Sequence, residues 1–282
     1  MEPFEYRAPT QLQEALDALA EFGPDAKVLA GGQSLMVLLR QRLIAPRLLV
    51  SLKRIDELAT IETPDPTLRL GCMVTYRVAA RSPEIVTRAP ILARATGSVG
   101  SVHIRNLGTI GGSLCHADPA GDVPTVLVAL GATLRVANGS GVTLHPADQF
   151  FTGLFETRLS SNEILVGIDI PPPEGSTTYG YGRFCYREGE YPMAVAACRL
   201  VWRGDLCVDA RVAIGGGDLY PKRLPEVEAV LAGRGVDDSV RADVREVLPS
   251  LLRPMPDVRG SGPWKSRVAM HLVERVLEEA SE

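Results

Sequence analysis

The sequence lacks several features by which common classes of protein are identified. No stretch reaches the roughly 18 consecutive apolar residues of a membrane-spanning helix, and the opening residues MEPFEYRAPTQ carry acidic side chains where a signal peptide has basic ones. The formal net charge is −4, so the basic excess that nucleic-acid binding requires is absent as well. We expect a cytoplasmic protein with no membrane insertion and no nucleic-acid partner.

Cysteine is too scarce and too scattered to define a cross-linked or metal-binding framework. The cysteines are odd in number and include no C-x-x-C pair: Cys72, Cys115, Cys185, Cys198 and Cys207. Neither a disulfide framework nor a zinc or iron–sulfur ligand set has this spacing. We expect buried or half-buried thiols in a reducing compartment, and no metal site in this chain.

What is present is a chain long enough for two or three moderate cores, with 282 residues of which 45% are hydrophobic. In residues 1–58, a capping-box pattern at Thr10 predicts a helix that ends at Gly23-Pro24. A strand over 27–30, a helix over 34–41 and a strand over 48–50 follow. This segment is predicted to form a small α/β lobe.

The rest of the chain divides at a run of prolines. Residues 59–175 read as strands and glycine turns interrupted by an apolar helix near 124–130, and the strand over 164–170 ends at Pro171-Pro172-Pro173. In residues 176–282, paired strands over 194–201 and 208–214 precede two or three helices. The predicted class is α+β, with a small α/β lobe and a larger mixed lobe followed by a C-terminal antiparallel sheet with helices.

The first of two glycine turns is A-G-G-Q-S-L, Ala30 to Leu35, between a predicted strand and a predicted helix. Two glycines allow a sharp turn and a close approach to a ligand. The N–H groups of Gln33, Ser34 and Leu35 would be free at the helix start, which suits a phosphate. The alternative is a plain strand-to-helix turn without a ligand.

The second turn, T-I-G-G-S, has the same character about 80 residues later. Gly111-Gly112 is expected to expose amides, and Thr109 and Ser113 add hydroxyls. No G-x-G-x-x-G or G-x-x-x-x-G-K-[ST] occurs, so neither a Rossmann site nor a P-loop is supported. Two such turns on different lobes could instead clamp the two phosphates of one dinucleotide.

Two carboxylates follow the second turn. Asp118 or Asp122 could accept hydrogen bonds from a ribose. Each also has a structural interpretation: Asp118 with Pro119 matches a helix N-cap followed by proline at the first helical position, and Asp122 would then lie one turn into that helix on a solvated face. The sequence alone leaves both interpretations open.

Beyond these turns, several motifs follow one another nearly end to end along the chain. They are F-x-Y-x-x-P-T, L-A-G-G-Q-S-L, I-R-N-x-G-T-I-G-G-S, H-A-D-P-x-x-D, E-I-L, R-x-G-E-Y and G-G-x-x-x-x-P-K-R. With these motifs in this order, the chain resembles the FAD-binding, medium subunit of the carbon monoxide dehydrogenase and xanthine dehydrogenase family of molybdenum hydroxylases. Each motif is weak alone, and the ordered set is specific.

The resemblance implies that FAD is held non-covalently, mainly by the two glycine turns. Asp122 would contact the adenosine ribose, Leu165 would pack near the adenine or the ring system, Arg183 would lie near the flavin, and Tyr191 would cover one face of the isoalloxazine. As a plain strand residue, Tyr191 would need no such role. The implied cofactor-binding residues are Val28, Leu29, Ala30, Gly31, Gly32, Gln33, Ser34, Leu35, Val99, Thr109, Ile110, Gly111, Gly112, Ser113, Asp118, Asp122, Leu165, Arg183 and Tyr191.

Some positions depart from the family pattern. Leu107 stands where arginine is frequent and Glu190 where aspartate is frequent, so the acceptor side of the flavin is expected to differ. The inserted cysteines that bind an extra cluster in one branch are absent. His103 and His116 are interpreted as structural rather than as points of covalent flavin attachment.

The implied function is electron transfer. A molybdopterin-binding large subunit would hydroxylate the substrate and feed a [2Fe–2S] subunit. That subunit would reduce FAD here, and an external acceptor such as quinone, NAD or another carrier would reoxidise it. No residue of this chain is expected to be catalytic toward the substrate. The alternatives are a self-sufficient flavin oxidase and a non-catalytic assembly subunit with the same fold.

Overall fold

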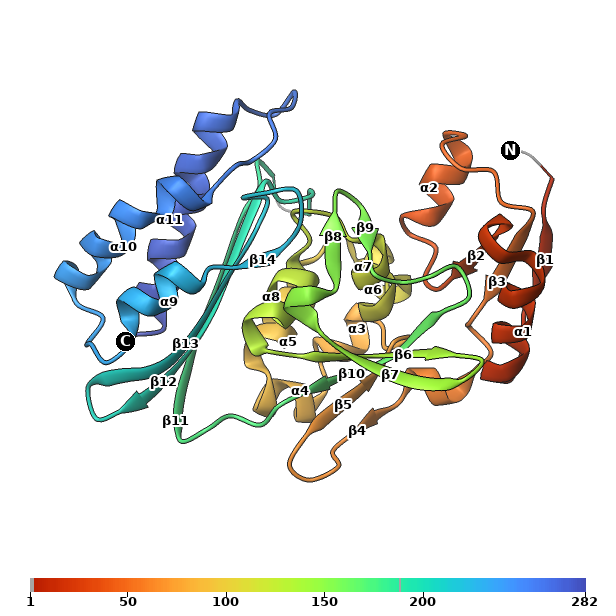
Figure 1. Cartoon of the computed structure of the whole chain (residues 1–282), viewed down its shortest axis with the longest axis horizontal. Coiled ribbons are helices and arrows are strands. Elements are labelled where there is room, and N and C mark those ends of the chain that lie inside the picture. The colour runs from red at the N-terminus through yellow and green to blue at the C-terminus, as the bar shows by residue number, and fades with distance from the viewer. Residues whose placement is uncertain (1–2, 188) are drawn as a thin grey trace.

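Three main sheets follow one another along the chain, each with its own helices (Figure 1). The computed structural model describes residues 3–187 and 189–282. In the N-terminal lobe, a parallel sheet has the strand order β1-β3-β2. Its elements are β1 (Glu5–Arg7), α1 (Leu12–Phe22), η1 (Gly23–Asp25), β2 (Ala26–Leu29), α2 (Leu35–Arg40) and β3 (Leu48–Ser51).

Helix α1 forms because Ala15, Leu16, Ala18 and Leu19 bury one face of it against this sheet. It ends at Gly23, as predicted, but the capping box at Thr10 is wrong. The N-cap is Gln11, which makes no side-chain cap bond. The Glu14 carboxylate instead reaches back to accept the Thr10 N–H at 3.1 Å, because the helix begins one residue later than the pattern suggests.

The middle lobe has an antiparallel sheet of order β4-β5-β10-β6-β7, with a small β8-β9 hairpin beside it. Its strands are β4 (Ile61–Glu62), β5 (Leu68–Gly71), β6 (Thr133–Asn138), β7 (Gly141–Pro146), β8 (Phe151–Gly153), β9 (Glu156–Thr157) and β10 (Ile164–Ile170). Its helices are η2 (Asp56–Ala59), α3 (Tyr76–Ala79), α4 (Pro83–Arg88), α5 (Pro90–Ser98), α6 (Val102–Leu107), α7 (Ile110–His116), α8 (Asp122–Leu130) and η3 (Ala147–Gln149).

The helices between β5 and α8 correct the prediction that this segment holds strands and glycine turns. Most of them are only one or two turns long, so their apolar residues show no helical period. Local caps define them instead: the side chains of Thr75, Ser82, Ser101 and Thr109 each accept an N–H from the first turn of the helix that follows.

The C-terminal domain is a four-stranded antiparallel sheet whose outer face is covered by three helices within the described residues (Figure 1). The strands are β11 (Ser176–Phe184), β12 (Ala194–Arg203), β13 (Leu206–Gly215) and β14 (Lys222–Arg223), and the helices are α9 (Pro225–Leu231), α10 (Asp238–Leu251) and α11 (Gly262–Glu279). The predicted pairing of the strands near 194–201 and 208–214 is confirmed as β12 with β13, and so is the α+β class.

Strand β12 lies between two hydrophobic cores. Val195 and Ala197 belong to the core of the first two lobes, whereas Ala196 and Cys198 pack under α9–α11. Helix α8 is buried at every position from Asp122 to Leu130, because it lies between the middle lobe and the inner face of the C-terminal sheet. Its first residue is therefore at the junction of the two domains. Among the described residues, no helix is both long and apolar enough to cross a membrane.

Candidate functional site

The two glycine turns lie against each other where the first two lobes meet. A Cβ on Gly31 would stand 1.9 Å from the Leu107 carbonyl oxygen, just before the second turn. A Cβ on Gly112 would stand 3.5 Å from the Cβ of Ala30. Segments about 80 residues apart in the sequence are thus in close contact, and the cleft expected between the lobes stays a prediction.

The first turn presents free backbone donors, as expected from its sequence. In the described structure, the N–H groups of residues 31–35 make no hydrogen bond to a protein acceptor, and the first helical bond runs from Met36 N–H to the Gly32 carbonyl at 3.1 Å. Gly32 has φ 71°, a left-handed conformation that favours glycine. The Gln33 side chain donates to the Gly31 carbonyl at 2.9 Å and fixes the turn. Consecutive free amides of this kind suit an anion.

The second turn differs, and the expectation that it exposes its amides is wrong. The Gly111 N–H donates to the Cys72 carbonyl at 2.9 Å, and the Gly112 N–H donates to Thr109 Oγ1 at 3.0 Å. The Ser113 N–H donates to the Thr109 carbonyl. These amides are occupied because the segment after β5 runs beside the turn and because Thr109 caps α7. The second turn therefore has no free amide at Gly111, Gly112 or Ser113 for a phosphate. What it presents is a close-packed backbone and the Ser113 hydroxyl.

Asp118 and Asp122 do not have the structural roles considered from the sequence. Helix α8 begins at Asp122 with Gly121 as its N-cap, so Asp118 is not the cap. The Asp118 carboxylate instead accepts the Ala120 N–H at 2.9 Å inside a preceding turn. Asp122 is 4% exposed rather than solvated. Burial raises the pKa of Asp118, and the Ala120 N–H opposes that rise.

Asp122 connects the first two lobes to the C-terminal domain. The Tyr181 hydroxyl donates to its Oδ1 at 2.7 Å, and the Arg183 Nε lies 3.2 Å from the same oxygen. Burial raises the pKa of Asp122, while Arg183 and then Tyr181 oppose the rise. Arg183 also donates to the Glu190 carbonyl at 2.9 Å. It thereby holds the loop that carries Tyr191.

Tyr191 reaches from the C-terminal domain toward the first glycine turn. Its side chain is half exposed, and its backbone carbonyl accepts from Arg259 Nη1 at 3.4 Å. Partial burial and the nearby Asp118 charge raise the pKa of the phenol, and a contact with the Ser34 side chain opposes the rise. The structure thus brings Tyr191, Ser34 and Asp118 together.

Tyr76 lies beside the second turn and is a candidate site residue that the sequence analysis missed. It is 7% exposed, and its ring packs against Gly108 next to the second turn. Burial raises the pKa of its phenol, and contact with Ser113 opposes the rise. Nothing in the sequence T-Y-R-V distinguishes it from a core tyrosine, because only the backbone pairing of residues 72–76 with the second turn brings it there.

The other residues predicted to bind the cofactor lie in the elements that flank the two turns or in the core. Val28 and Leu29 are half-buried in β2, which leads into the first turn. The Val99 carbonyl at the end of α5 accepts from Arg105 at 3.1 Å. Leu165 in β10 and Ile110 in α7 are core residues that are 3% and 0% exposed, and their contact with a cofactor stays a prediction.

The histidine and the cysteine of this segment have simple environments. The His116 ring lies 5.1 Å from that of Phe155 at a tilt of 40°. Burial lowers the pKa of His116, and Asp118 opposes the change. Cys115 is exposed, which corrects the expectation that all the thiols are at least half-buried. Within residues 3–187 and 189–282, no group of three or more His, Cys, Asp or Glu could hold a metal ion.

The geometry fits a dinucleotide with two phosphates. The free amides of the first turn can bind an anion, and the second turn lies in close backbone contact with that turn. Tyr191 lies near the first turn, and Tyr76 packs beside the second. The chain matches the family described as the FAD binding domain in molybdopterin dehydrogenase over residues 2–173. It matches the CO dehydrogenase flavoprotein C-terminal domain over residues 181–280.

Curated relatives and solved structures agree with these matches. The chain is 32% identical to the glyceraldehyde dehydrogenase medium chain of Sulfolobus acidocaldarius, covering 99% of this chain and 98% of the relative. It is 33% identical to the nicotine 6-hydroxylase medium subunit of Paenarthrobacter nicotinovorans, covering 98% and 96%. Superposition on the Hydrogenophaga pseudoflava carbon monoxide dehydrogenase gives a TM-score of 0.96 at 32% identity, covering 99% and 98%. This chain therefore belongs to the molybdopterin dehydrogenase FAD-binding family, as a medium, FAD-binding subunit of an oxidoreductase of the carbon monoxide dehydrogenase type.

Proposed function

We propose that this chain passes electrons from a [2Fe–2S] partner subunit, through its own FAD, to an external acceptor such as quinone, NAD or another carrier. A molybdopterin-binding large subunit would oxidise the substrate and supply those electrons. Relatives are named as medium chains or as subunits of dehydrogenase complexes, and one similar solved enzyme is described as lacking the Mo-pyranopterin moiety of its molybdenum cofactor. These names support a multi-subunit assembly for this chain.

The observation that carries the proposal is the pairing of a donor-rich turn with a close-packed one. FAD, when bound, supplies a flavin that accepts and releases electrons. The amides of residues 31–35 would hold its phosphates non-covalently, and the backbone contact between Gly31 and Leu107 keeps the two turns together. These residues bind and orient the cofactor, and substrate oxidation is assigned to the partners.

On the acceptor side, Tyr191 is proposed to cover one face of the flavin. Its ring lies near the first turn, and its loop is held by Arg183 and Arg259. A fixed aromatic ring can stack on the flavin and limit which oxidant reaches it. The neighbouring Glu190 and the exposed Leu107 are the family departures on this side.

The test is to purify the chain alone and together with its two proposed partners. We expect one FAD per chain, released completely by acid precipitation, and substrate oxidation only in the three-subunit complex. Colour that stays in the precipitate would establish covalent attachment instead. Robust substrate oxidation by the partner-free chain would establish a self-sufficient flavin oxidase, and a colourless chain that still assembles would establish an assembly subunit.

A further inference from the structure

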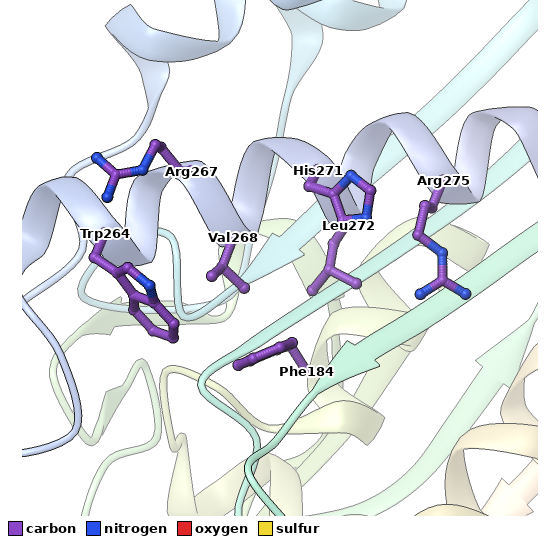
Figure 2. Close-up of a pocket in the computed structure, with 7 residues that line it drawn as sticks. All are labelled: Phe184, Trp264, Arg267, Val268, His271, Leu272 and Arg275. Carbon is purple, nitrogen blue, oxygen red and sulfur yellow. The ribbon is translucent and has the colours of Figure 1, made fainter.

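An apolar pocket of about 340 Å³ lies on the C-terminal domain, between helix α11 and the end of strand β11 (Figure 2). Trp264, Val268 and Leu272 point from the helix toward Phe184 on the strand. This spacing of four residues aligns the three helix side chains along one stripe. The pocket is thus an elongated apolar groove that no part of the described chain covers.

Basic side chains follow the same helix. Arg267, His271 and Arg275 also line the pocket, at intervals of four residues. Within the described residues, none of these three makes an ion pair or a side-chain hydrogen bond, and the neighbouring Glu274 is engaged by Arg245 at 2.8 Å. Eight residues of helix span about 12 Å, so this row is longer than a compact anion.

The aromatic end of the groove has the composition of an interface centre. The Trp264 ring stacks on that of Tyr186 at 6.1 Å with an interplanar angle of 17°, and it meets Phe184 edge-on at 5.7 Å. Tyr186 is 59% exposed, and Val258 in the preceding loop is fully exposed. Aromatic residues and arginine are the types that interface cores favour, and exposed apolar patches with a polar rim mark interaction sites.

Hydrogen bonds link the aromatic end of the groove to the loop beside the proposed flavin site. The Tyr186 hydroxyl donates to the Arg259 carbonyl at 2.6 Å, and the Arg259 guanidinium donates to the Tyr191 carbonyl at 3.4 Å. A partner seated on this surface would therefore contact the elements that hold the Tyr191 loop.

We propose that this groove docks an acidic, amphipathic segment of the iron–sulfur partner subunit. Its apolar side chains would enter between Trp264 and Leu272, and its carboxylates would meet Arg267, His271 and Arg275. This assignment rests on the proposed function, since the iron–sulfur subunit must come close to the flavin to reduce it, and the groove adjoins the elements that hold the Tyr191 loop. The length of the basic row favours a polypeptide segment over a small anion, because a small anion would engage only one end.

Photo-crosslinking tests where the partner lies. A p-benzoylphenylalanine placed at Val258, which is fully exposed, should cross-link to the iron–sulfur subunit in the assembled complex. The same group at Val142, an exposed position on β7, is the matched control and should not. A cross-link from position 258 to the large subunit or to a second copy of this chain would overturn the assignment.

Charge reversal tests the basic row. The double variant Arg267→Glu, Arg275→Glu should weaken association with the iron–sulfur subunit by about tenfold or more at low salt. The control pair Arg54→Glu, Arg203→Glu makes the same charge change elsewhere and should assemble as the parent does. FAD content and unfolding temperature equal to those of the control pair show that the double variant is folded.

The outcomes separate this inference from the proposed function. A parent chain that forms no complex with the two partners refutes the proposed function, and the docking assignment with it. A parent that assembles, with a charge-reversed variant that assembles equally well, leaves the proposed function intact and overturns the groove as a docking surface.

Discussion

Gly31 lies directly against the Leu107 carbonyl oxygen, which a Cβ on Gly31 would approach to 1.9 Å. The obstacle is backbone, so it cannot move aside as a flexible side chain would. This contact fixes the separation of the two glycine turns. Glycine at position 31 is therefore required by the meeting of two lobes, in addition to any approach of a phosphate.

Gly31→Ala is expected to lose most of its bound FAD, because the new methyl group must push the two turns apart. Overpacking of this kind typically costs about 1–3 kcal/mol. The measurement is flavin absorbance per chain together with the temperature of unfolding. Gly139→Ala is the control, since a Cβ there meets nothing within 4 Å. Parental flavin content in Gly31→Ala would show that the turns can separate freely.

Gly111→Val is expected to lower flavin content for a related reason. A Cβ at this position would lie 2.5 Å from the Cys72 Cβ and 2.7 Å from the Cys72 carbonyl oxygen. The backbone of Gly111 is not left-handed, so the expected effect comes from this clash and not from φ strain. Gly97→Ala, whose Cβ would make only an ordinary 3.7 Å contact, should keep parental flavin content. Equal flavin in both variants would contradict the clash argument.

The sequence predicts the parts of this site that depend on local chemistry. The first glycine turn has the conformation and the free amides expected of A-G-G-Q-S-L between a strand and a helix. What it could not predict depends on distant pairing. The amides of the second turn are occupied because residues 72–74 run beside it, and Asp122 is buried because β11, about 60 residues later, supplies Tyr181 and Arg183. No local pattern encodes either contact.

Tyr181→Phe tests the junction at Asp122. Removing the hydroxyl leaves a buried carboxylate with one donor fewer, which is expected to cost about 1–3 kcal/mol of unfolding free energy. Tyr179→Phe is the control on the same strand, because no hydrogen bond of its hydroxyl is present in the described structure. Denaturant unfolding measures both, and equal stability of the two variants would contradict a role for the Tyr181 hydroxyl.

The same variant has a predicted pH dependence. Burial raises the pKa of Asp122 above its ordinary value, so the folded state binds this proton more tightly than the unfolded state. The contribution of Asp122 to stability is therefore largest at low pH and declines as pH rises from about 4 through the raised pKa. Tyr181 opposes the shift, so Tyr181→Phe should make the decline steeper. A parallel decline in parent and variant between pH 4 and 7 would contradict this assignment.

Tyr191→Ala tests the proposed cover over the flavin. The phosphate contacts proposed for residues 31–35 do not involve this ring, so most FAD should remain bound, with a loss of about 0.5–1.5 kcal/mol from the missing aromatic contact. The reduced flavin should then react faster with acceptors that the ring excludes, and acceptor preference should change. Stopped-flow reoxidation with dioxygen, NAD and a quinone measures each rate.

Tyr191→Phe is the control. It keeps the ring but removes the hydroxyl near Ser34, and it should reoxidise as the parent does. If Tyr191→Ala, fully loaded with FAD, reoxidised with every acceptor at parental rates, Tyr191 would be a loop residue with no role at the flavin.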